Sequence, residues 1–173
     1  WGGDSSIVQD ELRNVRTIAR TTGSFAAIRE DGCVLTWGKG DSSGVRDQLG
    51  SGVREVVGSF GKFAAILAGG SVLEWGNPFP EASPPSGTAF QDVQHKLKNV
   101  LKIYHTDEAF AALLADGSIV CWGDGSAADP SESVYELLVN VQSIHSTSGA
   151  FAAVVGTGIG SSVITWGRDD HGG

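Results

Sequence analysis

Every tryptophan in this chain is followed by glycine, and four of the five Trp–Gly pairs end the same block of sequence. Each block begins at a valine, has Ile or Val three residues later, and then has a phenylalanine. The tryptophan lies 22 residues after the valine in three blocks and 25 in the fourth. This constancy predicts tandem copies of one supersecondary unit. The shared positions are Val15, Ile18, Phe25, Trp37; Val53, Val56, Phe63, Trp75; Val100, Ile103, Phe110, Trp122; and Val141, Ile144, Phe151, Trp166.

The blocks divide the whole chain into constant cores and variable connectors. A unit of this size cannot bury its own apolar face, so the hydrophobic core must form between neighbouring units. We therefore predict a single repeat domain over residues 1–173. The chain has no methionine and begins and ends within the motif, which indicates a piece of a longer array. The predicted cores are 15–38, 53–76, 100–123 and 141–167, and the connectors are 1–14, 39–52, 77–99 and 124–140.

Inside each block, short apolar runs are separated by turn residues, which is typical of strands. In the first block we expect strands over 15–21, 25–29 and 33–37. Asp31–Gly32, Gly69–Gly70 and Asp116–Gly117 lie between the second and third runs, and such pairs favour type I′ hairpin turns. In the third run, residues at both odd and even positions are apolar, and alternate residues of a strand point to opposite faces. Both faces of the sheet should therefore be covered.

Small antiparallel sheets that stack around an axis form a propeller, whose sequence signature is a periodic glycine and aromatic motif. The paired alanines at 26–27, 64–65, 111–112 and 152–153 would let adjacent sheets approach closely. We predict an all-β fold of four tandem antiparallel units, each of three or four strands, stacked as propeller blades. Part of a larger ring, a small closed ring and an open stack stay as alternatives, with an incomplete ring or open array favoured.

The pattern V-x-x-I-x(6)-F-A-A-I-x-x-D-G-x-V-x-T-W-G at Val15 to Gly38 resembles the regulator of chromosome condensation repeat. The resemblance covers all four copies. Their short form is similar to the blades of propeller-shaped β-lactamase inhibitor proteins and to long algal arrays described as ubiquitin-ligase-like. That family usually closes a ring of seven blades. The resemblance also implies two regulatory alternatives, namely guanine-nucleotide exchange and substrate recruitment in a ubiquitin ligase.

The composition narrows the classes of partner. The chain has 12 basic and 20 acidic residues, a formal charge of −8 and no basic run, which argues against nucleic acid or an anionic membrane. No apolar run is long enough to insert in a membrane. Cys33 and Cys121 occupy different repeat positions, so we expect buried small side chains rather than a disulfide or zinc site. An intracellular reducing compartment is mildly favoured, and the compartment is otherwise unknown.

The connectors carry two different patterns. Polar residues precede Leu12, Leu49 and Leu138, which predicts capped helical turns whose leucine packs under the blade. The connector 77–99 instead concentrates four of the five prolines and two aromatics. Prolines lower the entropy lost on docking and aromatics anchor interfaces. We therefore predict partner binding by Pro78, Phe79, Pro80, Pro84, Pro85 and Phe90, with a segment folded back on its own blade as an equal alternative.

We assign no catalytic residue, metal or cofactor. The four histidines occupy unrelated repeat positions, and His105 and His145 should lie at tolerant strand positions. Residues 156–162 look rich in glycine but precede a strand rather than a helix, so an enlarged hairpin loop is expected instead of a phosphate site. The acidic residues lack calcium-loop spacing.

The function best supported is a non-enzymatic protein-interaction scaffold with variable connectors as the contact surface. One alternative is a structural subunit or capping element in a large assembly. The other is the regulatory module that the resemblance implies. Open blade edges would also be able to self-associate.

Overall fold

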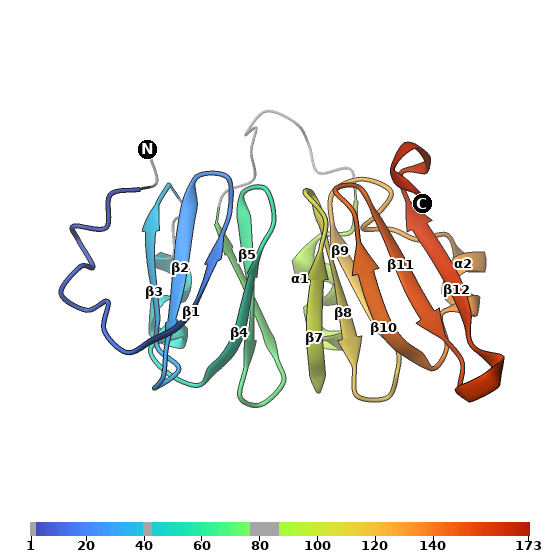
Figure 1. Ribbon diagram of the computed structural model, residues 1–173, viewed down its shortest axis with the longest axis horizontal. Coiled ribbons are helices and arrows are strands. Elements are labelled where there is room, and N and C mark those ends of the chain that lie inside the picture. The colour runs from blue at the N-terminus through green and yellow to red at the C-terminus, as the bar shows by residue number, and fades with distance from the viewer. Residues whose placement is uncertain (1–2, 40–42, 77–86) are drawn as a thin grey trace. The chain divides into compact units, whose positions relative to one another are not determined.

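The computed structural model describes residues 3–39, 43–76 and 87–173, and it divides the chain into two compact units. Unit 1 is Trp1–Ser83 and unit 2 is Pro84–Gly173. Each unit contains two three-stranded antiparallel sheets in the order of the sequence, here called blades (Figure 1). The all-β prediction is confirmed, with three strands in every blade. The prediction of one continuous domain stays a prediction.

Unit 1 holds blade 1, with strands β1 (Val15–Arg20), β2 (Ser24–Arg29) and β3 (Val34–Gly38), and blade 2, with β4 (Val53–Gly58), β5 (Lys62–Leu67) and β6 (Val72–Gly76). The 3-10 helix η1 (Ser43–Leu49) joins them. The strand bounds agree with the three apolar runs expected from the first block.

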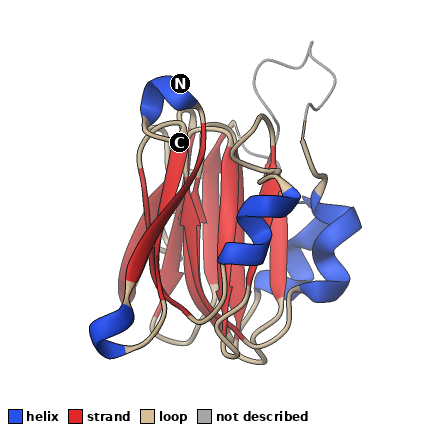
Figure 2. Cartoon of the chain, turned by 90° about the vertical axis from the view of Figure 1, so that its right-hand side faces the viewer, coloured by secondary structure: helices blue, strands red, loops and turns tan. Residues whose placement is uncertain are grey.

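Unit 2 repeats this arrangement. Blade 3 has strands β7 (Val100–His105), β8 (Ala109–Leu114) and β9 (Ile119–Gly123), preceded by α1 (Phe90–Val93) and η2 (Gln94–Lys96). Blade 4 has β10 (Val141–Ser146), β11 (Ala150–Val155) and β12 (Ser162–Gly167), preceded by α2 (Glu132–Leu137). Short 3-10 segments η3 (Gly158–Gly160) and η4 (Asp169–His171) complete the unit. Figure 2 shows the helical segments beside and beyond the ends of the strands rather than among them.

The glycine that follows the tryptophan of each third strand is required by the backbone. Gly76, Gly123 and Gly167 have φ of 105°, 122° and 122°. A Cβ on Gly76 would lie 2.5 Å from the carbonyl oxygen of Gly61, and one on Gly123 would lie 2.5 Å from that of Glu108. The third strand therefore ends where only glycine fits, and this explains the constant Trp–Gly pair.

The prediction of type I′ hairpin turns is wrong, although the hairpins exist. Among the described non-glycine residues only Asn14, Asn99 and Asn140 have positive φ, so Asp31 does not. Gly32 has φ 78° and its N–H donates to the carbonyl of Arg29 at 3.0 Å. A type I turn followed by a left-handed glycine gives this three-residue loop. Asp31 stabilises it because its carboxylate accepts the N–H of Cys33 at 3.0 Å.

A left-handed residue also precedes the first valine of every blade. Asn14, Gly52, Asn99 and Asn140 have φ between 52° and 73°. The carbonyl of Gly52 accepts the N–H of Ala68 at 2.7 Å, and that of Asn140 accepts the N–H of Gly156 at 3.2 Å. Asparagine and glycine tolerate this conformation best, so these positions set the entry into the blade.

Each blade has two faces of different composition. The aromatic face carries the Phe of the middle strand and the Trp of the third strand, which pair across the sheet as Phe63 and Trp75 do. The aliphatic face carries the residues that alternate with these along the strands, for example Ala26, Ile28 and Val34 in blade 1.

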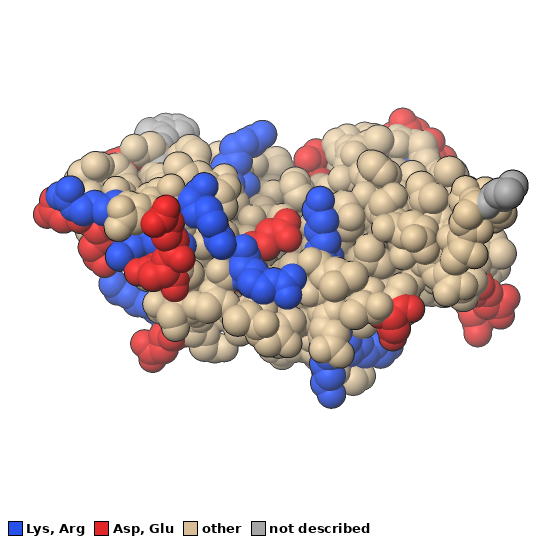
Figure 3. Space-filling view, turned by 60° about the horizontal axis from the view of Figure 1, so that its bottom comes forward, with Lys and Arg blue, Asp and Glu red and all other residues tan. Residues whose placement is uncertain are grey.

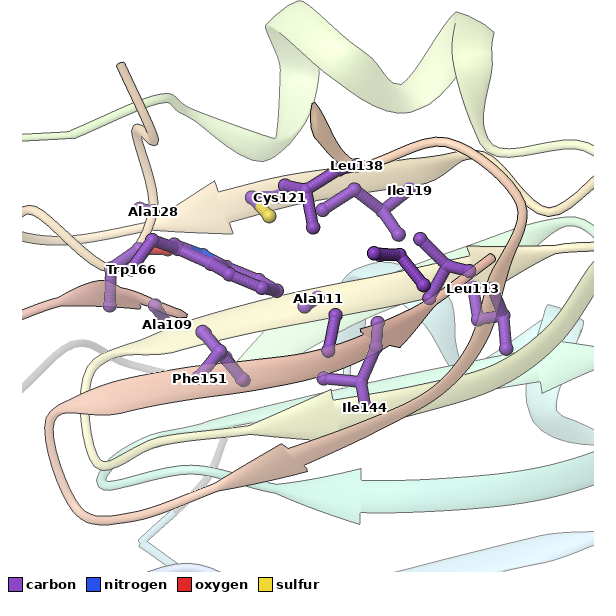
Figure 4. Close-up of a cluster of buried hydrophobic side chains, with 14 residues drawn as sticks. Ala109, Ala111, Leu113, Ile119, Cys121, Ala128, Leu138, Ile144, Phe151 and Trp166 are labelled. Carbon is purple, nitrogen blue, oxygen red and sulfur yellow. The ribbon is translucent and has the colours of Figure 1, made fainter. Parts of the chain in front are cut away.

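Inside each unit, the aliphatic face of the earlier blade packs on the aromatic face of the later one. In unit 1 the cluster joins Ala26, Ile28 and Val34 to Phe63 and Trp75. In unit 2 it joins the corresponding residues of blades 3 and 4 (Figure 4): Ala111, Leu113, Ile119 and Cys121 meet Ile144, Phe151 and Trp166. The prediction that the core forms between neighbouring units of the repeat is confirmed within both units.

Main-chain hydrogen bonds join neighbouring blades at both ends of the strands. Val53 N–H donates to the Gly32 carbonyl at 3.1 Å, and Val141 N–H donates to the Gly117 carbonyl at 3.0 Å. At the other end, Thr22 N–H donates to the Phe60 carbonyl and Asp107 N–H to the Ser148 carbonyl, both at 2.9 Å. Because equivalent atoms are used in both units, the blade-to-blade geometry is itself repeated.

Candidate interaction surface

The connectors cover the third strand of the blade that follows them. η1 contacts β6, α1 contacts β9 and α2 contacts β12. Covering an outer strand in this way protects it from pairing with another chain. Leu49 and Leu138 are buried and Leu12 is half-buried, so the expected packing of these leucines is confirmed for Leu49 and Leu138.

The connector 77–99 contains the residues predicted to bind a partner. Pro78, Phe79, Pro80, Pro84 and Pro85 lie outside the described residues. Phe90 opens α1 and is buried, with its ring centroid 5.9 Å from that of Trp122. Thr88 just before it accepts the N–H of Gly123 at 2.9 Å. The end of this connector is thus folded onto its own blade, and Phe90 serves the core there rather than an exposed surface.

The connector 124–140 exposes apolar side chains that sequence analysis missed. Ser131 caps α2, since its hydroxyl accepts the N–H of Val134 at 3.4 Å. Leu138 turns into the core, whereas Tyr135, Leu137 and Val139 are exposed. Exposed large apolar residues that are close together are typical of interaction sites. The run Leu137–Val139 has no periodicity from which this division could have been recognised.

We call Tyr135, Leu137 and Val139 the α2 patch. The acidic side chains Glu132 and Glu136 lie on the same helix and are exposed. An apolar patch with an acidic border suits a partner that presents apolar anchors and basic residues.

Tyr135 also links this patch to the core. Its side chain interacts with Cys121, which is buried against Trp166 and Leu138. Burial raises the pKa of the Cys121 thiol to about 12, and burial together with Cys121 raises the pKa of Tyr135. Cys121 is therefore a protonated core side chain at neutral pH, and its expected burial is confirmed, whereas Cys33 is only half-buried.

The aromatic residues predicted as the repeat core lie face to face in their blades. The Phe–Trp pairs have centroids 5.2 to 5.3 Å apart and interplanar angles of 21° to 28°. Six of these eight residues are buried, while Phe25 and Trp37 in blade 1 are half-buried. Trp166 also donates from Nε1 to the carbonyl of Ala127 at 3.1 Å, so the core holds the connector that carries the α2 patch.

The described residues give little support to a metal site, a histidine-based active site or a phosphate-binding loop. Within them, no group of three or more His, Cys, Asp or Glu side chains could hold a metal ion. His105 and His145 are exposed on β7 and β10 as expected. The glycine-rich loop after β11 leads through η3 directly into β12, so it is an enlarged hairpin loop. In the part of the chain that the structure describes, no helix is both long and apolar enough to cross a membrane.

Comparison with solved structures shows the fold. Prp20p from Saccharomyces cerevisiae matches with a TM-score of 0.63 and 14% identity over 93% of this chain and 46% of that protein. The ectodomain of the Arabidopsis thaliana receptor kinase ACR4 matches with a TM-score of 0.55 and 18% identity, over 88% of this chain and 49% of that one. Human WBSCR16 matches with a TM-score of 0.53 and 17% identity, over 91% and 48%.

The chain spans about half the length of these structures. The likeness shows that the four sheets are propeller blades of the type found in yeast RCC1 (Prp20). No protein-family model matches the sequence, and neither does any curated protein.

Proposed function

We propose that the protein is a non-enzymatic interaction scaffold, in which the blades supply a rigid support and the connectors supply the contact surface. The observation that carries this proposal is the α2 patch. Its three side chains are exposed on the same connector whose Ala127, Ala128 and Leu138 are buried. Rigid cores that present variable loops are a common division between support and recognition.

The structural neighbours support a protein partner. The Prp20p structure is described together with its binding to Gsp1p and histones. Another structure contains Kap60 bound to yeast RCC1 (Prp20). We infer that this chain also binds protein. The segment Pro78–Pro85, with Phe79, is proposed as a second contact on the sequence pattern alone, and Phe90 is assigned to the core that supports it.

Replacing Leu137 and Val139 by glutamate tests the proposal. The variant and the wild-type chain would be used as baits, and the captured proteins would be compared quantitatively by mass spectrometry. We expect the specific partners to be lost from the double variant, because a carboxylate buried at an interface is unpaired. Val163→Glu is the matched control, since Val163 is an exposed apolar residue of the same unit outside the connectors. An unchanged set of partners for the double variant would contradict the role of the α2 patch.

A parallel measurement with Phe79→Ala tests the other connector. Loss of binding in this variant alone would place the contact in residues 77–86 and leave the scaffold role intact. If no partner depends on either connector, the alternative role as a structural subunit becomes the better account. An exchange assay on small GTPases tests the regulatory alternative directly.

A further inference from the structure

Every connector has a leucine three or four residues before the first valine of its blade. Leu49, Leu97 and Leu138 are buried, and Leu12 is half-buried. The residues immediately before and after this leucine are exposed in all four connectors. Exposure at these two positions is therefore a property of the repeat itself, and it does not depend on which blade follows.

The connector 124–140 differs from the other three in what it places at these two exposed positions. Its residues there are Leu137 and Val139, which are 54% and 59% exposed. Polar residues or glycine evidently satisfy the architecture elsewhere, so packing does not require apolar side chains at these positions. Exposed apolar side chains that are close together mark interaction sites. The other connectors have Glu11 and Arg13, Gln48 and Gly50, and Lys96 and Lys98 at the same positions.

The part of unit 2 that carries the α2 patch is acidic. No lysine or arginine occurs between Lys102 and Arg168, and Arg168 pairs with Asp170 at 3.3 Å. The right-hand end of the face drawn in Figure 3, which belongs to unit 2, shows no blue side chain. Seven acidic residues lie in the same stretch: Asp107, Glu108, Asp116, Asp124, Asp129, Glu132 and Glu136.

Three of these carboxylates lie on the connector of the patch. Asp129, Glu132 and Glu136 are exposed, and within the described part of the chain none of them forms a salt bridge. Glu132 and Glu136 are one helical turn apart on α2, with Tyr135 between them in the sequence. Unpaired carboxylates beside exposed apolar side chains are complementary to a surface that offers cations beside apolar side chains.

We propose that the α2 patch binds a segment of a partner protein that combines apolar side chains with lysine or arginine. This inference rests on the proposed function and names the chemistry of the partner. The apolar side chains of the segment pack on Tyr135, Leu137 and Val139, and its cations pair with Glu132 and Glu136. Acidic segments are disfavoured, because like charges that face each other repel.

The support under the patch is already ordered. Trp166 donates from Nε1 to the carbonyl of Ala127 at 3.1 Å, and Ser131 caps the start of α2. Leu138, between the two exposed positions, is 4% exposed. A surface that is fixed before binding loses little conformational entropy on docking.

Selection from a displayed library of random peptides on the full chain tests the proposal. We expect the wild-type chain to enrich peptides in which Lys or Arg accompanies apolar residues. Fluorescence anisotropy of labelled selected peptides should show an affinity that falls as the salt concentration rises, because salt screens exposed ion pairs.

Reversing the two charges tests the pairing. Glu132→Lys combined with Glu136→Lys should raise the dissociation constant of the selected peptides at least about tenfold, and should itself enrich peptides with Asp or Glu. The neutral pair Glu132→Gln and Glu136→Gln should give a smaller loss. Asp107→Lys combined with Glu108→Lys is the matched control, since it changes the charge equally at exposed residues between β7 and β8 and should bind like the wild type.

All these residues are exposed, so the variants should fold, which thermal unfolding verifies. Selected peptides that are lost with Leu137→Glu and Val139→Glu, yet have no excess of Lys or Arg and bind the charge-reversed chain normally, overturn the proposed chemistry of the partner. The patch then remains an interaction site. If no selected peptide depends on the patch or on its two glutamates, the role of the patch in the proposed function fails as well.

Discussion

At the residue scale, the glycine that ends each third strand is a strong backbone constraint. In blade 2, Gly76 has φ 105° and no room for a Cβ beside Gly61. Gly69, seven residues before it in the same blade, has no atom within 4 Å of a Cβ. The two glycines differ in conformation and contacts, so they separate the effect of strain from the general effect of adding a methyl group.

We expect Gly76→Ala to lower the free energy of unfolding by about 2 kcal/mol or more, because the new Cβ is strained and collides with main-chain atoms. Gly69→Ala should change it by about 0.5 kcal/mol or less. Urea denaturation of both variants checks this. Equal losses in the two would show that the close approach to Gly61 is not what selects glycine.

Cys121 gives a prediction of pH dependence. Burial raises its pKa to about 12, whereas an unfolded cysteine titrates near ~8.5. The unfolded state therefore loses this proton first as the pH rises. The contribution of the protonated Cys121 thiol to stability is complete below pH ~8.5. It is lost progressively as the pH rises from ~8.5 to about 12.

The measurement is the free energy of unfolding between pH 8 and 10.5 for the wild-type chain and Cys121→Ala. We expect a steeper decline for the wild type, by about 1.4 kcal/mol for each pH unit above ~8.5. Groups remote from Cys121 are common to both proteins and cancel in the comparison. Tyr135 does not cancel, because Cys121 helps to raise its pKa, so the slopes are compared below about pH 9.5, before an unfolded tyrosine titrates. Parallel declines would contradict the deep burial of the thiol.

At the element scale, the blades differ in how much of their aromatic pair is covered. Phe151 in blade 4 is buried, whereas Phe25 at the same position of blade 1 is half-buried. The cost of truncating a side chain follows the apolar area and the cavity that it leaves.

Phe151→Ala should therefore cost about 3–5 kcal/mol in the unfolding of unit 2, and Phe25→Ala about half of that or less in unit 1. Chemical denaturation followed by circular dichroism compares them. The prediction fails if the two losses are equal, since coverage by the preceding blade would then contribute little.

Sequence reasoning predicted the elements well because each depends on local pattern repeated in register. The valine, phenylalanine and tryptophan landmarks identified the strands, and apolar residues of both parities in the third strand implied two covered faces. The turn type was missed because Asp–Gly suits both a type I′ turn and a type I turn followed by a left-handed glycine. Only the φ of Asp31 distinguishes them.

The interaction surface was less accessible to sequence reasoning. Phe90 lies at the end of a proline-rich segment, where an aromatic residue resembles an exposed anchor, but α1 turns it onto Trp122. Leu137, Leu138 and Val139 are similar in sequence, and only the packing of α2 decides which of them is buried. Tertiary contacts that no local pattern encodes account for both differences.

At the scale of the whole molecule, each unit has its own hydrophobic cluster. Stability in repeat proteins is approximately a sum of terms for each repeat and its neighbours. Disrupting one cluster should therefore destabilise mainly the unit that contains it.

Hydrogen exchange measures this directly. In Phe151→Ala we expect faster amide exchange across β7 to β12, while the middle strands β2 and β5 keep their wild-type protection. The wild-type chain under the same conditions is the reference. A matched rise in exchange of both units would show that they unfold as one cooperative body.

The main-chain bonds between successive blades have a consequence for engineering. Hydrogen bonds from valine amides to turn carbonyls fix the distance between the two blades of each unit. The connector inside a unit therefore need only span the distance between two fixed strands. A foreign epitope inserted at an exposed position of the connector 124–140 should then leave the spacing of blades 3 and 4 unchanged, provided that Ala127, Ala128 and Leu138 keep their buried places.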